Sequence, residues 1–418
     1  MNEWDKNLRW HLFEDSAENL KEELGEEASK NFFNNIENLN NSYNRFKIPI
    51  KFLELAKRVH YSFNSVKSNK NNRKTVIFQD VLSKRYPSIV SSVSKLYNPV
   101  LIGETLFSLF NPSRTFYQPV YFPIYSIYMD IYSGILDNNE MLLQKALDDL
   151  MQTFKDLNPD LIVLNQDAFP ESRAVIMVAK KMGIPTIEIQ HGTYQPGFIS
   201  TGRYVDEVFV WGEYFRKLYY DEKIRKPGEV KILGYPYELE TMTKKSQEKI
   251  VLYYLGQNFE AVDSNLLDVK IKTVNFLQKL CEDLGFGFVY RFHPSDQLDL
   301  LRSNIPGIEF TPQGETLKES FKKGDIFISF NSTSLIEASL RSKLCIQLRN
   351  YDLPADNFEK LGICAKTVKT LEELELFIRE ISKIENFCDS FGSVDRNYIE
   401  VPTPNPGARF LELIDDLI

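Results

Sequence analysis

The sequence predicts an α/β fold with two Rossmann-like domains, and three observations indicate it. Short apolar segments, of the kind that form strands buried on both faces, alternate with helix-like segments from about residue 74 onward. A polar stretch over residues 238–248 divides this alternation into two parts of similar size. The 418 residues are 43% hydrophobic, which is enough to fill two domain cores. We expect the carboxyl edges of the two sheets to face each other across a cleft.

Four segments follow from this pattern. Residues 1–70 are rich in Glu, Lys and Asn and carry apolar residues at helical spacing, so we expect a helical N-terminal extension. Residues 71–240 and 249–400 are the two expected Rossmann-like domains. Residues 401–418 are expected to form a C-terminal helix.

In the first domain, buried strands are expected at the aliphatic and aromatic segments 75–78, 99–102, 161–164, 186–189, 205–212 and 230–236. Helices are expected between them, at 83–96, from 124, and at 141–157, 173–182 and 213–221. The three prolines within 111–123 predict a loop. We interpret the aromatic run 114–128 as core or interface packing.

The second domain repeats the alternation. Strands are expected at 250–255, 286–292, 308–310, 325–330 and 344–348, and helices at 264–284, 335–341, 370–384 and 407–418.

Composition excludes several classes of protein. A formal net charge of −8 argues against a nucleic-acid binder with a broad basic surface. The sequence has no long uncharged apolar run and no signal-peptide pattern, so we expect a cytoplasmic protein. The four cysteines are widely spaced, which is typical of reduced core residues. No two of the four histidines have metal-ligand spacing, so we expect neither a metal nor a cofactor.

The first domain places two kinds of acid–base group at one sheet edge. Asp167 follows the strand at 161–164, Glu171 begins the next helix, and His191 follows the strand at 186–189. Strand–helix–strand connectivity brings these strand ends to the same carboxyl edge. Asp167 and Glu171 are candidate general bases for an acceptor hydroxyl. Asp167 could equally cap the following helix.

The second domain has a candidate anion site. Ser332, Thr333 and Ser334 stand between a buried strand and a helix, where backbone N–H groups and the helix dipole favour negative charge. A single capping hydroxyl is the alternative. Glu337, one turn later, is a candidate ribose ligand or an ordinary surface glutamate.

His293 is followed by Pro294, which stops the strand there and holds the imidazole at the sheet edge. An imidazole so placed can hydrogen-bond or protonate a leaving phosphate. The alternative is a structural histidine. Gly256 and Gln257 close the first strand of this domain.

The order Gly256-Gln257, His293-Pro294, Ser332–Ser334 and Glu337 resembles bacterial sialyltransferase-like glycosyltransferases of the GT-B fold and the related β-Kdo transferases. This resemblance implies a metal-independent glycosyltransferase that uses a CMP-activated keto sugar. It implies that His293-Pro294 contacts the nucleotide phosphate, that the serine-rich motif holds this phosphate, and that Gly256-Gln257 belongs to the same donor site. It also implies that an acidic residue of the first domain is the base, so that the first domain binds the acceptor and the second the nucleotide donor.

A second resemblance is carried by Gln190–Thr193, which looks like the histidine motif of teichoic-acid glycerol- or ribitol-phosphate transferases. It implies CDP-activated polyols and makes His191 the base. Two further alternatives are a UDP-sugar 2-epimerase-like enzyme and a non-catalytic sugar-nucleotide-binding subunit.

We predict a glycosyltransferase of capsule or lipopolysaccharide biosynthesis. Its partners would be a nucleotide-sugar donor and a surface glycan or lipid-linked acceptor, with no nucleic acid. Such an acceptor is compatible with peripheral association at the inner face of the plasma membrane.

Overall fold

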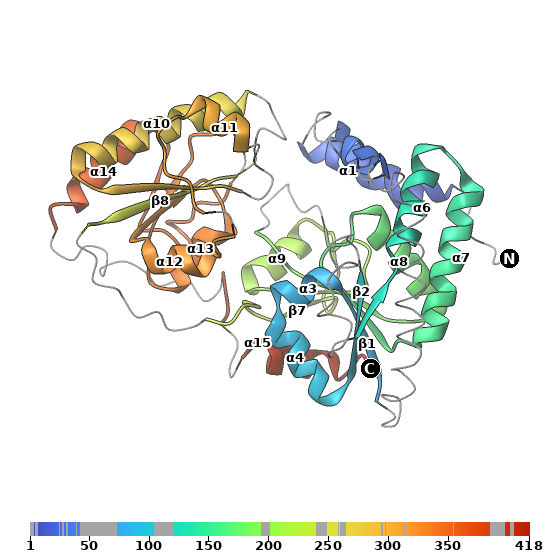
Figure 1. Ribbon diagram of the computed structural model, residues 1–418. Coiled ribbons are helices and arrows are strands. Elements are labelled where there is room, and N and C mark those ends of the chain that lie inside the picture. The colour runs from blue at the N-terminus through green and yellow to red at the C-terminus, as the bar shows by residue number, and fades with distance from the viewer. Residues whose placement is uncertain are drawn as a thin grey trace. The chain divides into compact units, whose positions relative to one another are not determined.

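The computed structural model describes residues 4, 7–24, 26, 29–30, 32–38, 40–41, 73–103, 120–193, 201–239, 249–257, 259, 265–293, 296, 298–312, 314–353, 355–384, 398–401 and 405–418. The chain forms two compact units (Figure 1). The N-terminal unit comprises Met1–Glu238 together with Ile399–Ile418, and the C-terminal unit comprises Leu239–Tyr398. Pro294, the linker residues 240–248 and Cys388 lie outside the described residues.

Within the described residues, the N-terminal unit holds a seven-stranded parallel sheet in the order β3-β2-β1-β4-β5-β6-β7. Its strands are β1 Thr75–Gln79, β2 Asn98–Gly103, β3 Val120–Pro123, β4 Leu161–Leu164, β5 Thr186–Ile189, β6 Glu207–Val210 and β7 Val230–Ile232. The central strands β1, β4 and β5 are buried at every position. The sequence of β4 is continuously apolar, as is typical of a strand buried on both faces.

The helices of this unit are η1 Trp10–Glu14, α1 Asp15–Leu24, α3 Asp80–Arg85, α4 Pro87–Leu96, α6 Tyr125–Leu136, α7 Glu140–Leu157, α8 Pro170–Met182, α9 Glu213–Asp221 and α15 Pro406–Ile414. One helix had been predicted over 83–96, but Pro87 splits it because proline cannot donate the helical hydrogen bond. Helix α8 begins with Pro170 and ends at Gly183, whose φ of 69° forms the left-handed cap predicted from the sequence.

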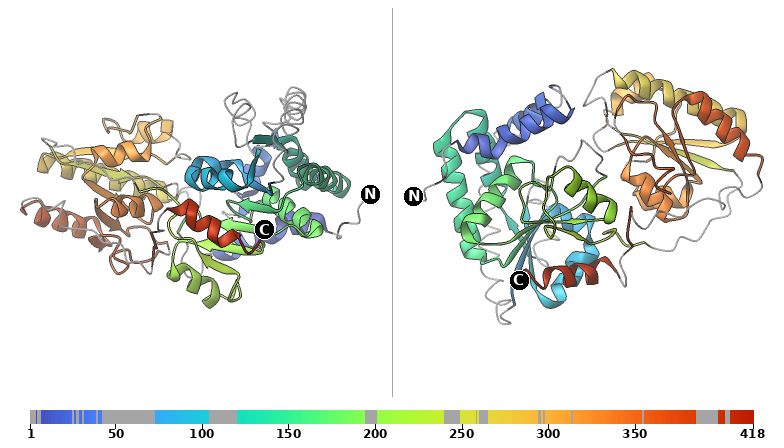
Figure 2. Two further views of the ribbon diagram at one scale, coloured as in Figure 1. Left: turned by 90° about the horizontal axis from the view of Figure 1, so that it is seen from below. Right: turned by 180° about the vertical axis from the view of Figure 1, so that it is seen from behind.

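The C-terminal helix α15 belongs to the N-terminal unit and lies beside α4 (Figures 1 and 2). Phe410 packs against Phe78 of β1 and Phe209 of β6 at ring-centroid distances of 6.1 and 5.8 Å. Gly407 permits this close approach, since a Cβ there would lie 2.1 Å from the Ser92 hydroxyl oxygen. The last residues of the chain therefore complete the core of the first domain.

The described residues of the C-terminal unit contain a five-stranded parallel sheet in the order β12-β11-β10-β8-β9. Its strands are β8 Val251–Leu255, β9 Gly287–Arg291, β10 Ile326–Ser329, β11 Leu344–Leu348 and β12 Lys366–Val368. Its helices are α10 Leu266–Leu284, α11 Leu298–Asn304, α12 Leu317–Lys323, α13 Thr333–Leu340 and α14 Leu371–Ile381. Figure 1 shows α10, α11 and α14 along one face of this sheet and α12 and α13 along the other.

Two predicted elements differ from the structure. The stretch 111–123 had been predicted to be a loop. Residues 111–119 lie outside the described residues, but Val120–Pro123 forms β3, which pairs with β2 at the edge of the sheet. Proline is tolerated on an edge strand because one side of the strand needs no donors. The strand predicted at 308–310 is reduced to a single bridge between Tyr290 and Phe310.

Cys281, Cys345 and Cys364 are buried and free. No helix in the described part of the chain is long and apolar enough to cross a membrane.

Candidate functional site

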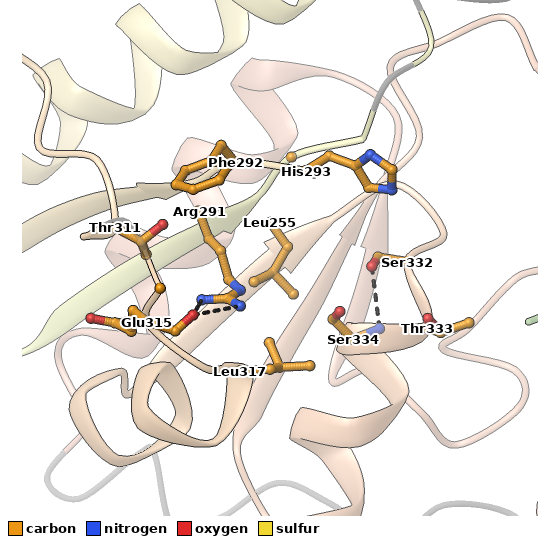
Figure 3. Close-up of a pocket in the computed structure, with 12 residues that line it drawn as sticks. Leu255, Arg291, Phe292, His293, Thr311, Glu315, Leu317, Ser332, Thr333 and Ser334 are labelled. Carbon is orange, nitrogen blue, oxygen red and sulfur yellow. Dashed lines mark hydrogen bonds between the residues drawn. The ribbon is translucent and has the colours of Figure 1, made fainter. Parts of the chain in front are cut away.

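The C-terminal unit contains a cavity of about 370 Å³ at the carboxyl edge of its sheet (Figure 3). Strands β9 and β10 flank β8 on opposite sides, so the order of the sheet reverses there. Ligands of open α/β sheets bind at such a reversal. The cavity is lined by the ends of β8 and β9, the start of α13 and the connection into α12: Leu255, Gly256, Arg291, Phe292, His293, Thr311, Gly314, Glu315, Leu317, Ser332, Thr333 and Ser334.

The start of α13 forms one wall of this cavity. Ser332 is the N-cap residue, and its Oγ accepts a hydrogen bond of 3.2 Å from the backbone N–H of Ser334. The capping interpretation therefore explains Ser332, whereas Thr333 and Ser334 also line the cavity. Three residues that carry hydroxyl groups therefore line the cavity at the positive end of the helix dipole, which suits an oxyanion.

His293 is exposed and lies on the same side of the cavity as Ser332 (Figure 3). Its backbone N–H donates a hydrogen bond of 2.7 Å to Oδ2 of Asp296. The end of β9 and the start of α13 therefore bring an imidazole and a group of hydroxyls to one cavity, as the sequence motifs had led us to expect.

Arg291, which precedes this histidine by two residues, was not predicted from the sequence. Its Nη1 donates to Ser320 Oγ at 2.7 Å, and Nη1 and Nη2 both donate to the Glu315 backbone oxygen at 3.3 Å. Burial lowers the pKa of Arg291, and the nearby carboxylate of Glu315 opposes that effect. An arginine remains a cation at physiological pH, so the cavity contains a fixed positive charge.

Gly256 and Gln257 shape the site in different ways. A Cβ on Gly256 would lie 2.4 Å from the Tyr290 hydroxyl oxygen, so only glycine fits there without a shift. Gln257 is outside the cavity lining, because its amide is directed at the neighbouring strand end. Its Oε1 accepts from Ser329 Oγ and the Asn331 backbone N–H at 3.0 and 3.1 Å, and its Nε2 donates to Asn331 Oδ1 at 2.6 Å. Gln257 thus ties β8 to the loop that precedes α13.

Glu337 is also outside the lining of this cavity. Its carboxylate lies 3.5 Å from Arg341 Nη1, one turn further along α13. The role of Glu337 as a ribose ligand therefore stays a prediction.

In the N-terminal unit, the turn that carries His191 is held by Gln190. The Gln190 Nε2 donates to Gly192 O at 2.7 Å, and its Oε1 accepts from the Trp211 backbone N–H at 2.9 Å. Its backbone oxygen accepts from Trp211 Nε1 at 2.9 Å and Tyr86 Oη at 3.1 Å. A buried amide thus fixes the backbone on both sides of the imidazole.

Arg85, a second residue missed from the sequence, lies next to this turn. Its Nη1 donates to Asn165 Oδ1 at 3.1 Å. Burial first, and then the charge of Arg85, lower the pKa of His191 to about 4, although a hydrogen bond with the Asn165 backbone opposes both effects. The imidazole is therefore neutral at physiological pH and has one ring nitrogen able to accept a proton or hydrogen bond.

Asp167 is fully buried, and both of its carboxylate oxygens accept hydrogen bonds. Oδ1 accepts from the Gly202 backbone N–H at 2.8 Å and lies 3.2 Å from the Thr201 hydroxyl. Oδ2 accepts from the backbone N–H groups of Tyr204 and Val205 at 2.5 and 3.3 Å. The sequence had suggested a base or a helix cap, but in the structure this carboxylate anchors the loop at 201–205.

Glu188 lies beside Asp167 and was not predicted. Its Oε2 accepts from the same Thr201 hydroxyl at 2.6 Å and the same Gly202 N–H at 3.1 Å. Burial raises the pKa of Glu188 well above its usual value, and the charge of Asp167 raises it further. The opposing effects are the two hydrogen bonds and the charge of Arg225. Burial and the neighbouring charge therefore both favour the protonated form of Glu188 over a second buried carboxylate.

Glu171 lies in the first turn of α8 and is partly buried. Its Oε2 accepts a hydrogen bond of 2.7 Å from the Tyr132 hydroxyl. Burial raises the pKa of Glu171, and the hydrogen bond from Tyr132 opposes this. Among the described residues, no group of three or more His, Cys, Asp or Glu side chains has a metal-binding arrangement.

Solved structures with a similar fold cover both units. The S. aureus MnaA–UDP co-structure is 14% identical with a TM-score of 0.56, over 82% of this chain and 98% of that one. A UDP-N-acetylglucosamine 2-epimerase is 12% identical with a TM-score of 0.54, over 82% and 95%. The Neisseria meningitidis UDP-GlcNAc 2-epimerase bound to UDP-GlcNAc is 12% identical with a TM-score of 0.52, over 82% and 98%.

The fold is the GT-B fold. The predicted class, two Rossmann-like α/β domains, is confirmed by the two parallel sheets and these structural neighbours. No family model matches the sequence, and no curated protein sequence does. At these identities the likeness establishes the fold alone.

Proposed function

We propose that this protein is a nucleotide-sugar-dependent glycosyltransferase whose donor phosphate binds at the start of α13. The observation that carries the proposal is the composition of the 370 Å³ cavity: His293, Arg291 and the hydroxyls of Ser332–Ser334 line one space at the reversal of the sheet order. These are cationic and hydrogen-bond-donating groups. They suit the phosphate of a nucleotide better than an apolar or cationic ligand.

In this proposal the bond between the sugar carbon and the donor phosphate oxygen breaks, and negative charge grows on the leaving phosphate. The hydroxyls and the first N–H groups of α13 stabilise that charge, and His293 donates a hydrogen bond or a proton to it. Arg291 is held by Glu315 and Ser320, so it adds a fixed positive potential to the cavity.

The acceptor hydroxyl must lose a proton as the new bond forms. His191 and Glu171 are the residues of the N-terminal unit that we propose for this step, since both are partly exposed and both have an accepting atom. Asp167 has no part in this step, because its carboxylate is buried and bonded to the loop at 201–205.

The nucleotide base is a finer part of the proposal. The motif resemblance indicates a CMP-activated keto sugar and a surface glycan or glycolipid acceptor. Two of the structural neighbours contain UDP or UDP-GlcNAc, so cytidine nucleotides should be compared directly with uridine nucleotides in binding assays.

Epimerisation of a UDP-sugar at C2 is the second candidate, favoured by the fold neighbours that are named as 2-epimerases. It differs from transfer in its requirements. An epimerase converts its donor without any acceptor, whereas a transferase releases free nucleotide in proportion to glycosylated acceptor.

The experiment has two steps. Thermal unfolding of the full chain with CMP, CDP, UDP and GDP identifies the nucleotide that binds. The corresponding nucleotide sugar is then incubated with and without a glycan acceptor, and the products are separated. Transfer predicts acceptor-dependent nucleotide release that His293→Ala reduces about 10²–10⁴-fold. Acceptor-independent formation of the C2 epimer would instead establish the second candidate, and stabilisation by none of the four nucleotides would contradict both.

A further inference from the structure

A buried ion pair lies behind the cavity of the C-terminal unit. Lys270 of α10 and Asp296, which follows β9, are separated by 3.0 Å between Nζ and Oδ1. Their side chains are 1% and 0% exposed. Removing two charges from water is unfavourable, and a buried pair is often no more stabilising than two apolar residues of similar size. Stability alone therefore gives little reason for charges at these positions.

The second carboxylate oxygen of Asp296 points to the strand that ends at the cavity. Oδ2 accepts hydrogen bonds from the Tyr290 hydroxyl at 2.9 Å and from the His293 backbone N–H at 2.7 Å. The backbone N–H of Asp296 donates in return to the His293 carbonyl at 2.9 Å. The peptide groups on both sides of the histidine Cα are thus fixed by one residue, and that residue is fixed by Lys270.

The same contacts shape the cavity wall. The Tyr290 hydroxyl that donates to Asp296 occupies the position where a side chain at Gly256 would begin. The Gly256 backbone N–H donates to the carbonyl of Arg291 at 2.8 Å. The end of β9, from Tyr290 to His293, is therefore held from β8 on one side and from Asp296 on the other.

We propose that Lys270 and Asp296 are positioning residues for His293, and that they hold its imidazole at the place where the donor phosphate binds. Asp296 acts through the histidine backbone, and Lys270 acts through Asp296. The inference rests on the proposed function, because it assumes that His293 meets a phosphate. A displacement of about 1 Å at a catalytic group is enough to lower a rate about 10²-fold, so a rigid support has functional value.

The test compares two double variants of the full chain that both remove the charges. Lys270→Met/Asp296→Asn keeps a side-chain oxygen that can accept the His293 N–H. Lys270→Met/Asp296→Leu keeps a similar volume and removes the acceptor. The chain has four histidines, so the imidazole signals in an NMR spectrum can be assigned with His293→Ala as reference. The probes are CMP and UDP, each added at saturation.

A bound phosphate should raise the measured pKa of His293 by roughly 0.5 or more in the wild type, because a nearby negative charge favours the imidazolium. We expect the pKa of His293 to rise equally in the Asn double variant and by less than half as much in the Leu double variant. The nucleotide affinity of both variants, measured by calorimetry, should change less than about threefold. An equal rise in both would overturn the positioning role while leaving the proposed function intact. No rise in the wild type with either nucleotide would overturn the proposed function and this inference with it.

A purely structural role would lower the melting temperature of the Leu variant without changing the response of His293. If that variant does not fold, as judged by circular dichroism, Tyr290→Phe replaces it, since this change removes one of the hydrogen bonds to Asp296 and no charge. A response of His293 in Tyr290→Phe that equals the wild-type response would then overturn the proposal.

Discussion

Replacing Glu188 with Gln should remove a large part of the pH dependence of unfolding of the N-terminal unit. Glu188 is fully buried beside Asp167, and both carboxyl groups contact the hydroxyl of Thr201 and the N–H of Gly202. Two ionised carboxylates sharing these donors would repel each other. Burial first, and then the charge of Asp167, raise the pKa of Glu188 well above its usual value.

The direction of this pH dependence follows from comparing Glu188 in the folded and unfolded states. An unfolded glutamate loses its proton near pH 4.3, whereas Glu188 in the fold keeps it to a higher pH. Its contribution to stability is therefore fully present below the unfolded pKa and is lost as pH rises towards the folded pKa. Between the two values, one proton separates the states, and the free energy of unfolding falls by about 1.4 kcal/mol for each pH unit.

Glutamine is neutral and nearly isosteric with protonated glutamate, so Glu188→Gln should lack this slope. The assay is urea unfolding at about pH 5.5, 6.0 and 6.5. Tryptophan fluorescence reports on the correct unit, because Trp4, Trp10 and Trp211 all belong to the N-terminal unit. As pH rises above the unfolded pKa, the wild type should lose stability relative to the variant, by at most about 1.4 kcal/mol for each pH unit.

Glu222→Gln, at an exposed position after α9, is the matched control. It should leave the change of unfolding free energy with pH the same as in the wild type. Parallel stability curves for wild type and Glu188→Gln would refute the reasoning, because they would show that Glu188 ionises alike in both states.

Three further predictions follow from single contacts. In an NMR titration with isotope-labelled histidine, His191 should stay neutral as the pH is lowered to about 4. Arg85→Met should raise the pKa of His191, because a nearby positive charge is removed. An unchanged pKa would show that the charge of Arg85 does not act on His191. Gly256→Ala should destabilise the C-terminal unit by about 1–3 kcal/mol in a circular-dichroism melt, since the new methyl group meets the Tyr290 hydroxyl. Phe410→Ala should lower the free energy of unfolding of the N-terminal unit, followed by tryptophan fluorescence, by about 3–5 kcal/mol. An unchanged free energy would show that the C-terminal helix is not part of this core.

The strand–helix alternation and the groups at strand ends could be predicted because they depend on local sequence. An apolar run followed by a polar turn marks the carboxyl edge of a parallel sheet wherever it occurs. His293 and Ser332–Ser334 were found in this way, and the structure brings them to one cavity.

The partners of buried polar groups could not be predicted because they come from distant parts of the chain. Asp167 looked accessible at a strand end, but the loop at 201–205 covers it. Glu188 stands between Ile187 and Ile189 in β5, and nothing in this local sequence shows that its spatial neighbour is another carboxyl group. The sequence predicted Arg291 to be an ordinary strand residue. Its guanidinium lies at the cavity because it bonds to Glu315, in the connection that leads into α12. The C-terminal helix is amphipathic, but its sequence does not identify α4 as its partner.

The central claim is that a nucleotide phosphate binds to the hydroxyls at the start of α13. Calorimetry of Ser332→Ala/Ser334→Ala with the nucleotide that best stabilises the wild type tests it most directly. A hydrogen bond to a charged group contributes about 1.5–3 kcal/mol, so we predict at least a tenfold loss of affinity. Thr370→Ala, which removes the cap of α14 in the same unit, controls for lost capping and should leave affinity unchanged. Unchanged affinity in the Ser332→Ala/Ser334→Ala variant would contradict the account, because the hydroxyls would then be helix caps and nothing more.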